Sequence, residues 1–316
     1  MPFWDPRCFD LNDKINAEIW ADSPQLQQGI HPPLALEAAG AFGAQQAMIE
    51  LADRVFWDNL QPPSILPWVP DLVGKRWKKK DAVFVVGSAY AGFIKEYSTR
   101  TAAMNLCCYA TANSATQFQE RFLQDVVQPD SDYYGKLELL VQPYLYASQL
   151  CLMDLCRASF VKRGNRVTRR PMDTSKEPNR GPAWNNYLAY AQHVQSDDWT
   201  WRRLTESKTE KIVALGWIAE HGILQLFGRN LNPGFTIIDR DGAPLDLPDF
   251  WNRTYAHPGR NLGYWLNEDD WWIVQGQVGG EKRRWRVLPI YHPSRVESYD
   301  PLYARTRGLF AEYLNA

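Results

Sequence analysis

The sequence contains no long apolar run and no marked excess of charge of either sign. No stretch approaches the roughly 20 apolar residues that a membrane-spanning helix needs. Residues 1–8 lack the basic stretch followed by an apolar core that defines a secretory signal. The formal net charge is −1 at pH 7. We therefore expect a cytoplasmic protein without a membrane partner, and the net charge by itself indicates no particular ligand.

Cysteine is scarce and poorly spaced for metal binding. The chain has five cysteines: Cys107 and Cys108 are adjacent, four residues separate Cys151 from Cys156, and Cys8 is remote. Zinc and iron–sulfur sites usually show pairs of thiols about two to four residues apart. We expect reduced, mostly buried thiols and no metal or other cofactor.

The composition is that of a globular protein, with 45% hydrophobic and 22% charged residues over 316 positions. No internal repeat divides the chain, so we predict a single α/β domain over residues 1–316, and we expect a monomer. Residues 34–56 have helical spacing, which predicts a helical N-terminal extension over residues 1–80. Residues 228–286 are rich in Gly, Pro, Asn and Asp, which predicts an insertion of hairpins and loops.

Four short apolar runs predict the strands of a buried parallel sheet. They cover residues 81–87, 150–155, 211–216 and 286–291, and helical patterns lie between them and after the last one. Alternation of strand and helix is typical of a parallel sheet covered on both faces. The predicted fold is a four-stranded parallel sheet flanked by helices on both faces, with the insertion before the last strand.

Ligands of parallel α/β sheets bind outside the carboxyl ends of the strands. In this sequence those ends carry Gly87, Ser88, Asp154 and His292. A histidine in this position favours function over a structural role, and Asp154 is a second candidate whose alternative is a cap or an arginine partner. Aromatic residues just after the first strand, Tyr90 and Phe93, offer a stacking surface or belong to the core.

These strand ends, in this order, resemble the uracil-DNA glycosylase superfamily. The resemblance rests on the segment from Gly87 to Phe93, on Asp154, on the turn at residues 214–216 and on His292-Pro293-Ser294. It spans roughly residues 81–314 and leaves residues 1–80 and 228–286 uncovered. It implies hydrolysis of an N-glycosidic bond of a damaged or deaminated base that is flipped out of single- or double-stranded DNA.

The resemblance also implies roles for individual residues. Tyr90 or Phe93 would stack on the flipped base and Asp154 would bind its edge. His292 would donate a hydrogen bond to the charge that develops on the leaving base. Substrate contacts would come from the first motif and the last loop, namely from Gly87, Ser88, Ala89, Ser294 and Arg295. Arg295, Val296 or Tyr299 could wedge into the space that the flipped nucleotide leaves in the duplex.

Two residues depart from the family pattern. Many members have Asp or Asn at the position of Ala89, where it positions the attacking water, and alanine cannot do this. Glu96 is the nearby candidate for that role. The base-reading Asn of the family corresponds to Asp154, and an ionised carboxylate only accepts hydrogen bonds. An ionised Asp154 would therefore suit an exocyclic amine or a ring N–H better than the O4 acceptor of uracil.

Positive charge is gathered in three runs, at residues 75–80, 157–170 and 282–286. Such runs can hold a polyanion even when the whole protein is nearly neutral, although they can also be solvated loops. We expect the first two runs to flank the strand ends and to form a track for DNA.

Three alternative functions remain open on the sequence. A nucleic-acid-binding module that has lost the chemistry would explain Ala89 and Asp154. An α/β enzyme acting on a free nucleotide or nucleoside would suit the near-neutral charge. A serine hydrolase is disfavoured because Ser88 lacks the glycine of a Gly-x-Ser-x-Gly elbow two positions later.

Overall fold

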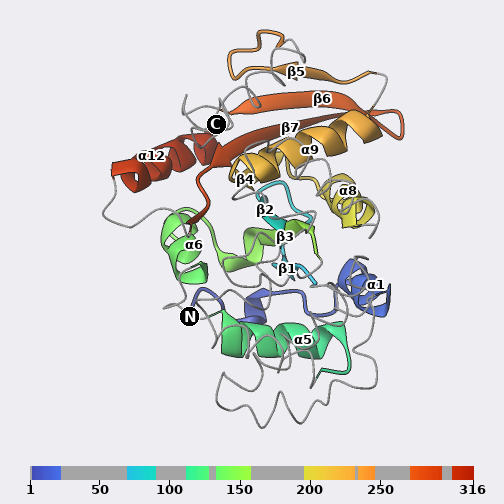
Figure 1. Ribbon diagram of the computed structural model, residues 1–316, viewed down its shortest axis with the longest axis vertical. Helices are drawn as coiled ribbons and strands as arrows, with labels where there is room; N and C mark the ends of the chain where they lie inside the picture. Colours follow the sequence, from blue (N-terminus) through green and yellow to red (C-terminus); the bar gives the residue numbers. More distant parts are fainter. Residues whose placement is uncertain are drawn as a thin grey trace, which may run out of the picture.

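The computed structural model describes residues 2–22, 70–89, 112–127, 133–157, 196–231, 234–245, 271–293 and 301–316 (Figure 1). None of the helices in these ranges is long and apolar enough to cross a membrane. The predicted helix at residues 34–56 lies outside the described residues.

One mixed sheet organises the described chain. Its seven strands follow the spatial order β1-β3-β2-β4-β7-β6-β5. The four central strands β3, β2, β4 and β7 run parallel to one another, whereas β1 pairs antiparallel with β3, β6 with β7, and β5 with β6. The strands are β1 Leu72–Val73, β2 Val83–Ala89, β3 Leu150–Cys156, β4 Lys211–Leu215, β5 Thr236–Ile238, β6 Trp272–Val278 and β7 Glu281–Ile290.

The parallel core predicted from the four apolar runs is confirmed, but the expected number of strands is wrong. The region predicted as an insertion contributes β5 and β6 to the sheet, and β7 begins at Glu281 rather than at residue 286. Gly279 and Gly280 form the two-residue turn between β6 and β7, with φ values of 58° and 86°. A Gly-Gly pair suits such a hairpin because glycine adopts positive φ without steric cost. The sequence therefore contained a hairpin signal at this point.

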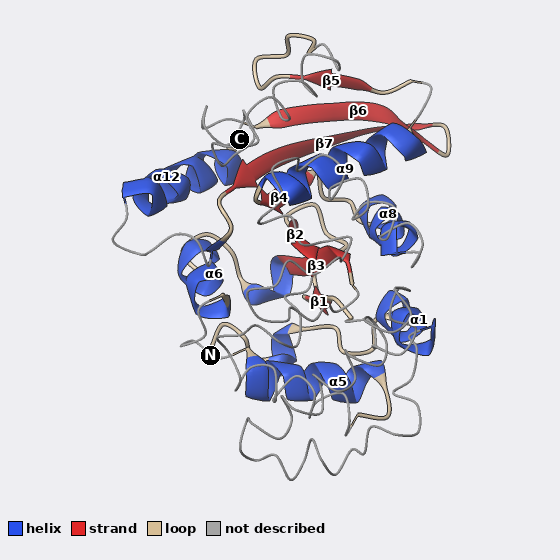
Figure 2. Ribbon diagram, in the orientation of Figure 1, coloured by secondary structure: helices blue, strands red, loops and turns tan. Residues whose placement is uncertain are grey.

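Helices pack against the two faces of the sheet in separate groups (Figure 2). Alternate residues of β2 point to opposite faces, so that Val83 and Val85 belong to one apolar cluster and Phe84 and Val86 to the other. The first cluster includes residues of α5 (Ala115–Arg121), α6 (Tyr134–Val141) and α12 (Pro301–Asn315). The second includes residues of α1 (Lys14–Asp22), α8 (Ser196–Glu206) and α9 (Trp217–Asn230). Three short helical turns complete the described elements: η1 (Pro6–Cys8), η3 (Phe122–Val126) and η4 (Ala147–Gln149).

The described N-terminal residues are part of the core. Phe3, Trp4 and Phe9 are buried in the first cluster, and Ile15 and Ile19 of α1 are buried in the second. Phe9 also forms an isolated antiparallel bridge with Gly74, next to β1. This N-terminal segment therefore covers the β1 side of the sheet.

The strand order contains one topological switch point. From β2 the chain moves to β3 on one side, and it then crosses to β4 and β7 on the other side. Ligands of open α/β sheets bind in the crevice at such a point, outside the carboxyl ends of the two strands involved. For this chain the rule points to the ends of β2 and β4, which are flanked by the ends of β3 and β7.

Candidate functional site

Asp154 lies directly beside Gly87 at the carboxyl end of the parallel strands. The two residues are register partners on β3 and β2. A Cβ atom placed on Gly87 would lie only 2.1 Å from Oδ1 of Asp154. The carboxyl group therefore occupies the space that a side chain at position 87 would need, and any other residue there would force the Asp154 carboxyl group to move.

The surroundings of Asp154 favour its protonated form. Burial and the negative charge of Asp71 together raise its pKa to about 7, although the charge of Arg157 acts in the opposite direction. A carboxyl group with such a pKa is partly protonated at neutral pH. It then offers one donor and one acceptor, as an amide does.

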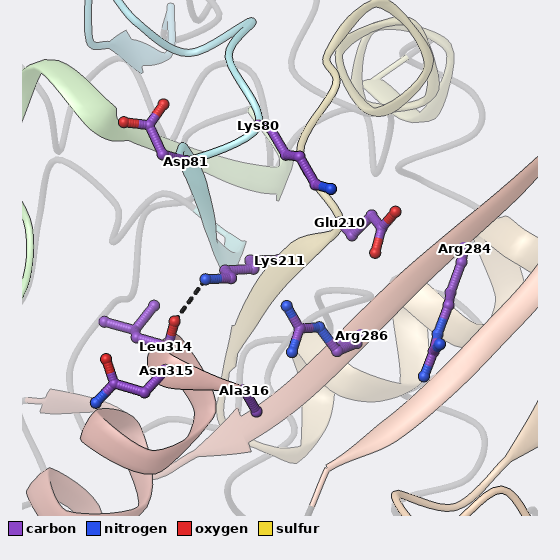
Figure 3. A pocket seen from close by; sticks show the side chains of 9 residues that line it. All are labelled: Lys80, Asp81, Glu210, Lys211, Arg284, Arg286, Leu314, Asn315 and Ala316. Carbon is purple, nitrogen blue, oxygen red and sulfur yellow. Dashed lines mark hydrogen bonds between the residues drawn. The ribbon is translucent and has the colours of Figure 1, made fainter.

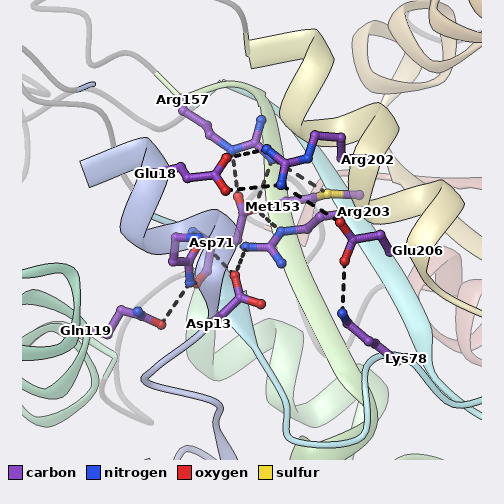
Figure 4. Close-up of polar contacts among 11 residues, drawn as sticks. Asp13, Glu18, Asp71, Lys78, Gln119, Met153, Arg157, Arg202, Arg203 and Glu206 are labelled. Atoms are coloured by element: carbon purple, nitrogen blue, oxygen red, sulfur yellow. Dashed lines mark hydrogen bonds and ion pairs between the residues drawn. The ribbon is translucent and has the colours of Figure 1, made fainter. Parts of the chain in front are cut away.

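Asp71 keeps its negative charge because two buried arginines surround it (Figure 4). Arg157 donates from Nε and a terminal nitrogen to the two carboxylate oxygens of Asp71, at 2.8 and 2.9 Å. The Nε of Arg203 donates to Asp71 at 2.5 Å. Burial opposes ionisation of Asp71, but the two guanidinium groups hold its pKa below the ordinary value.

This buried polar cluster joins segments that are distant in the sequence. Arg203 on α8 also donates to Asp13 and to Asn16, both at 2.7 Å. The side-chain amide of Asn16 donates to the backbone carbonyl of Asp71 at 2.8 Å. Because Arg157 directly follows β3, the cluster fixes the end of the strand that carries Asp154.

His292 follows β7 and packs against a residue that the sequence analysis did not nominate. Its ring stacks on Tyr133, with 5.1 Å between ring centroids and an interplanar angle of 24°. His292 also lies close to Gly216, which directly follows β4. A Cβ atom built on Gly216 would lie 4.0 Å from the Cβ atom of His292. The backbone N–H of Gly216 donates to the carbonyl of Ile290 at 2.7 Å, which holds the ends of β4 and β7 together.

Tyr133 stacks on His292 and lies within electrostatic range of Asp154. Burial raises the pKa of Tyr133 well above its ordinary value, and the charges of Asp154 and Tyr134 act in the same direction. Tyr133 and Tyr134 contact each other edge to face, with centroids 4.8 Å apart. Tyr133 directly precedes α6 and does not lie at a strand end, so the rule that ligands bind at the carboxyl ends of strands does not predict it. In the sequence, it is marked only by the pair of tyrosines before an apolar helical pattern.

Only some of the predicted site residues lie within the described ranges. Gly87, Asp154 and His292 lie at the carboxyl edge, and Ser88 and Ala89 are the last residues of β2. The remaining nominated residues lie outside the described residues, namely Tyr90, Phe93, Glu96, Ser294, Arg295, Val296 and Tyr299.

The strand directions correct the prediction for the first basic run, whereas residues 158–170 of the second run lie outside the described residues. Residues 75–80 precede β2 and so lie at its amino end, on the opposite edge of the sheet. Residues 282–286 form the first half of β7, and Arg286 pairs with Lys211 at the amino end of β4. Arg157, the one described member of the second run, is buried and bound to Asp71. The charges of these residues are therefore not available beside Asp154.

A second carboxyl group with a raised pKa lies on the other face of the sheet. Burial raises the pKa of Glu220, in the first turn of α9, to about 8, although Trp272 donates to it at 3.1 Å. Trp272 belongs to the second apolar cluster, whereas Tyr133 packs against the first. Glu220 is therefore separated from Asp154 by the sheet. In the described ranges, no group of three or more His, Cys, Asp or Glu side chains is arranged to hold a metal ion.

The chain matches no protein-family model, and no curated protein is similar to it at a significant level. The fold and the site define an α/β protein with a mixed seven-stranded sheet and a polar site at its switch point. Function has to be argued from the chemistry of that site.

Proposed function

We propose that the protein is a DNA glycosylase-like hydrolase that cleaves the N-glycosidic bond of a flipped, deaminated base. The observation on which the proposal rests is the position of Asp154. Its carboxyl group lies over Gly87 at the switch point, with a pKa of about 7, in the same neighbourhood as Tyr133 and His292.

A protonated Asp154 removes the chemical objection to a deaminated base. Uracil and hypoxanthine each present a carbonyl acceptor beside a ring N–H donor. A protonated carboxyl group matches this pair with its O–H and its second oxygen, as the amide of Asn would. The ionised form cannot donate to the carbonyl. The aspartate therefore substitutes for an amide below a pH of about 7.

The remaining groups have roles in the bond cleavage. Water adds to C1′ of the sugar while the C1′–N bond breaks, and the bonding electrons leave with the base, which takes up a proton. His292 donates a hydrogen bond to the charge that develops on the base. Tyr133 positions the imidazole by stacking on it. Ala89 cannot activate the water, and Glu96 is the residue that we propose for this step.

The experiment is base release from labelled oligonucleotides that contain uracil, hypoxanthine, xanthine or an ordinary mismatch, followed by alkaline cleavage of abasic sites. We expect release of uracil or hypoxanthine, with kcat/KM falling above about pH 7 as Asp154 ionises. Asp154→Asn keeps the donor and the acceptor, so it should retain activity and lose this alkaline decline. Asp154→Ala and His292→Ala should both be inactive.

A control variant tests whether the effects are specific to Asp154. Asp198→Asn changes an exposed carboxylate on α8 and should leave both the rate and its pH profile unchanged. Binding of DNA without release of any base would replace the proposal with a binding module. An alkaline decline that persists in Asp154→Asn would refute the role given to Asp154.

A free nucleoside is the second candidate substrate. It is favoured by the location of the described basic residues, because the runs at 75–80 and 282–286 lie at the amino edge, away from Asp154. A mononucleoside needs no phosphate track. Turnover of deoxyuridine or deoxyinosine as fast as the same base in an oligonucleotide would favour this candidate.

A further inference from the structure

A basic cleft lies at the amino edge of the parallel strands, opposite the candidate functional site (Figure 3). It encloses about 530 Å³. Its walls come from the segments that lead into β2 and β4, from β7, and from the end of α12. The lining residues are Lys80, Asp81, Glu210, Lys211, Arg284, Arg286, Leu314, Asn315 and Ala316.

The positive charges of the cleft outnumber the negative ones. Four cationic side chains face two carboxylate side chains, and Asp81 already forms an ion pair with Arg76 and accepts a hydrogen bond from Gln149. Within the described part of the chain, the four cations form no ion pair with a carboxylate. The cleft therefore keeps a local excess of positive charge.

The two central cations are held close together although they repel each other. Lys211 and Arg286 are register partners on the adjacent strands β4 and β7. Lys211 donates to the carbonyl of Leu314 at 2.6 Å. Burial and the charge of Arg286 lower the pKa of Lys211, although the charges of Asp81 and Glu210 act in the opposite direction. Like charges side by side on neighbouring strands are destabilising unless another group compensates them.

Arg286 also has a buried donor without a partner. Its Nε atom is buried, and no described group accepts a hydrogen bond from it. The guanidinium group lies over the ring of Tyr313, whose hydroxyl donates to the backbone carbonyl of Arg286 at 2.7 Å. The arginine is thus fixed by packing while one donor stays unsatisfied, which is unusual for a buried polar atom.

We propose that this cleft binds a phosphate-bearing ligand with at least two phosphate groups. An oxyanion between Lys211 and Arg286 would compensate their repulsion and accept hydrogen bonds from the guanidinium group of Arg286. Guanidinium groups match the geometry of phosphate oxygens, and lysine adds a mobile positive charge.

The size of the cleft and a neighbouring basic hollow favour a ligand with more than one phosphate group. Arg284 and Arg286 are two residues apart on β7, so their side chains emerge on the same face about 7 Å apart. A second hollow of about 520 Å³ shares Glu210 and Arg284 with the cleft and adds the cations Lys208, Lys282 and Arg283. A di- or triphosphate of a nucleotide and the backbone of a nucleic acid share the required chemistry.

This inference is independent of the proposed function, because the cleft and Asp154 lie at opposite edges of the sheet. Sodium pyrophosphate serves as the probe, titrated into the full chain at low salt and followed by calorimetry. We expect saturable binding, weakened about tenfold by Arg286→Gln and again by Arg284→Gln. Lys79→Gln removes an exposed charge next to Lys80 and outside the cleft, and should leave the affinity unchanged.

Two further readings define the ligand and test the site. In a competition experiment, pyrophosphate is added to the protein with a bound fluorescent oligonucleotide. Displacement of the oligonucleotide identifies a nucleic acid backbone as the natural source of the phosphates. Binding of pyrophosphate without displacement identifies a small phosphate compound. Both results agree with the proposal if Arg284→Gln, with unchanged thermal unfolding, weakens the binding. Absence of pyrophosphate binding, or equal affinity in Arg284→Gln, Arg286→Gln and Lys79→Gln, would overturn it. Base release that is unaffected by Arg284→Gln would leave both proposals standing separately.

Discussion

Oδ1 of Asp154 occupies the position next to Gly87 where a side chain would begin, 2.1 Å from where a Cβ atom would lie. The two residues pair across β2 and β3 at the carboxyl edge of the sheet. The identity of residue 87 therefore controls where the carboxyl group of Asp154 can lie, and the candidate site can be tested by changing a residue that has no functional group.

Gly87→Ala should displace the carboxyl group of Asp154 or push the two strands apart. Overpacking of a buried site costs about 1–3 kcal/mol, and we expect a loss of this size in the free energy of unfolding by urea. We also expect base release to fall as it does in Asp154→Ala, because the carboxyl group leaves its position.

Gly308→Ala is the matched control for this change. Gly308 lies within α12, and nothing lies within 4 Å of a Cβ atom built there. This variant should keep its activity and gain about 0.5–1 kcal/mol of stability from the better helix propensity of alanine. The double variant Gly87→Ala/Asp154→Ala should recover part of the stability lost in Gly87→Ala. Without such a recovery, the steric conflict is not between these two residues.

Asp154 should make the protein less stable as the pH rises. Its pKa is about 7 in the folded chain and 3.8 ordinarily, so between these values the folded state binds a proton that the unfolded state has lost. Stability therefore falls through this window, by roughly 1–3 kcal/mol for a side chain that keeps some exposure. Asp154→Asn should unfold like the original protein near pH 4 and be more stable at pH 7.5.

The measurement is urea unfolding of both proteins at several pH values between 4 and 8. Asp198→Asn provides a control for the removal of an exposed carboxylate. A stability difference between Asp154→Asn and the original protein that stays constant over this range would contradict the raised pKa.

Arg203 and Arg202 are adjacent on α8 and should respond very differently to the same substitution. Arg203 is fully buried between Asp71 and Asp13, whereas the side chain of Arg202 is 42% exposed and pairs with Glu18 at the surface. Arg203→Met leaves buried carboxylates uncompensated and should cost about 3–5 kcal/mol. Arg202→Met should cost at most about 1 kcal/mol. Equal effects in thermal or urea unfolding would show that the buried cluster does not hold the strand ends together.

Tyr133 should act through its ring rather than its hydroxyl. Tyr133→Leu removes the stacking partner of His292, and an aromatic pair contributes about 0.5–1.5 kcal/mol beyond its area. We expect kcat/KM for base release to fall about threefold to tenfold, with little change in KM. Tyr133→Phe keeps the ring and should retain the rate. If the phenylalanine variant is as slow as the leucine variant, the hydroxyl rather than the stacking is the important feature.

The parallel core could be predicted because its strands are buried on both faces. The runs at residues 81–87, 150–155 and 211–216 are continuous and apolar, and they correspond to β2, β3 and β4. Their carboxyl ends share one edge of the sheet, so the sequence alone predicts Asp154 and His292 as site residues. The sequence predicts hairpins for residues 228–286, but not that β5 and β6 continue the main sheet. The charged residues at positions 281–284, where β7 begins, do not resemble a buried strand.

The sequence by itself determined the parallel strands and the polar residues at their ends, because both follow from local patterns of apolar and polar side chains. Only the tertiary structure decided the pKa of Asp154, which depends on burial and on Asp71, a residue 83 positions earlier in the chain. It also decided that Tyr133 stacks on His292 and that two basic runs meet at the amino edge. Strand order and strand direction fix which residues distant in the sequence become neighbours, and no local pattern encodes them.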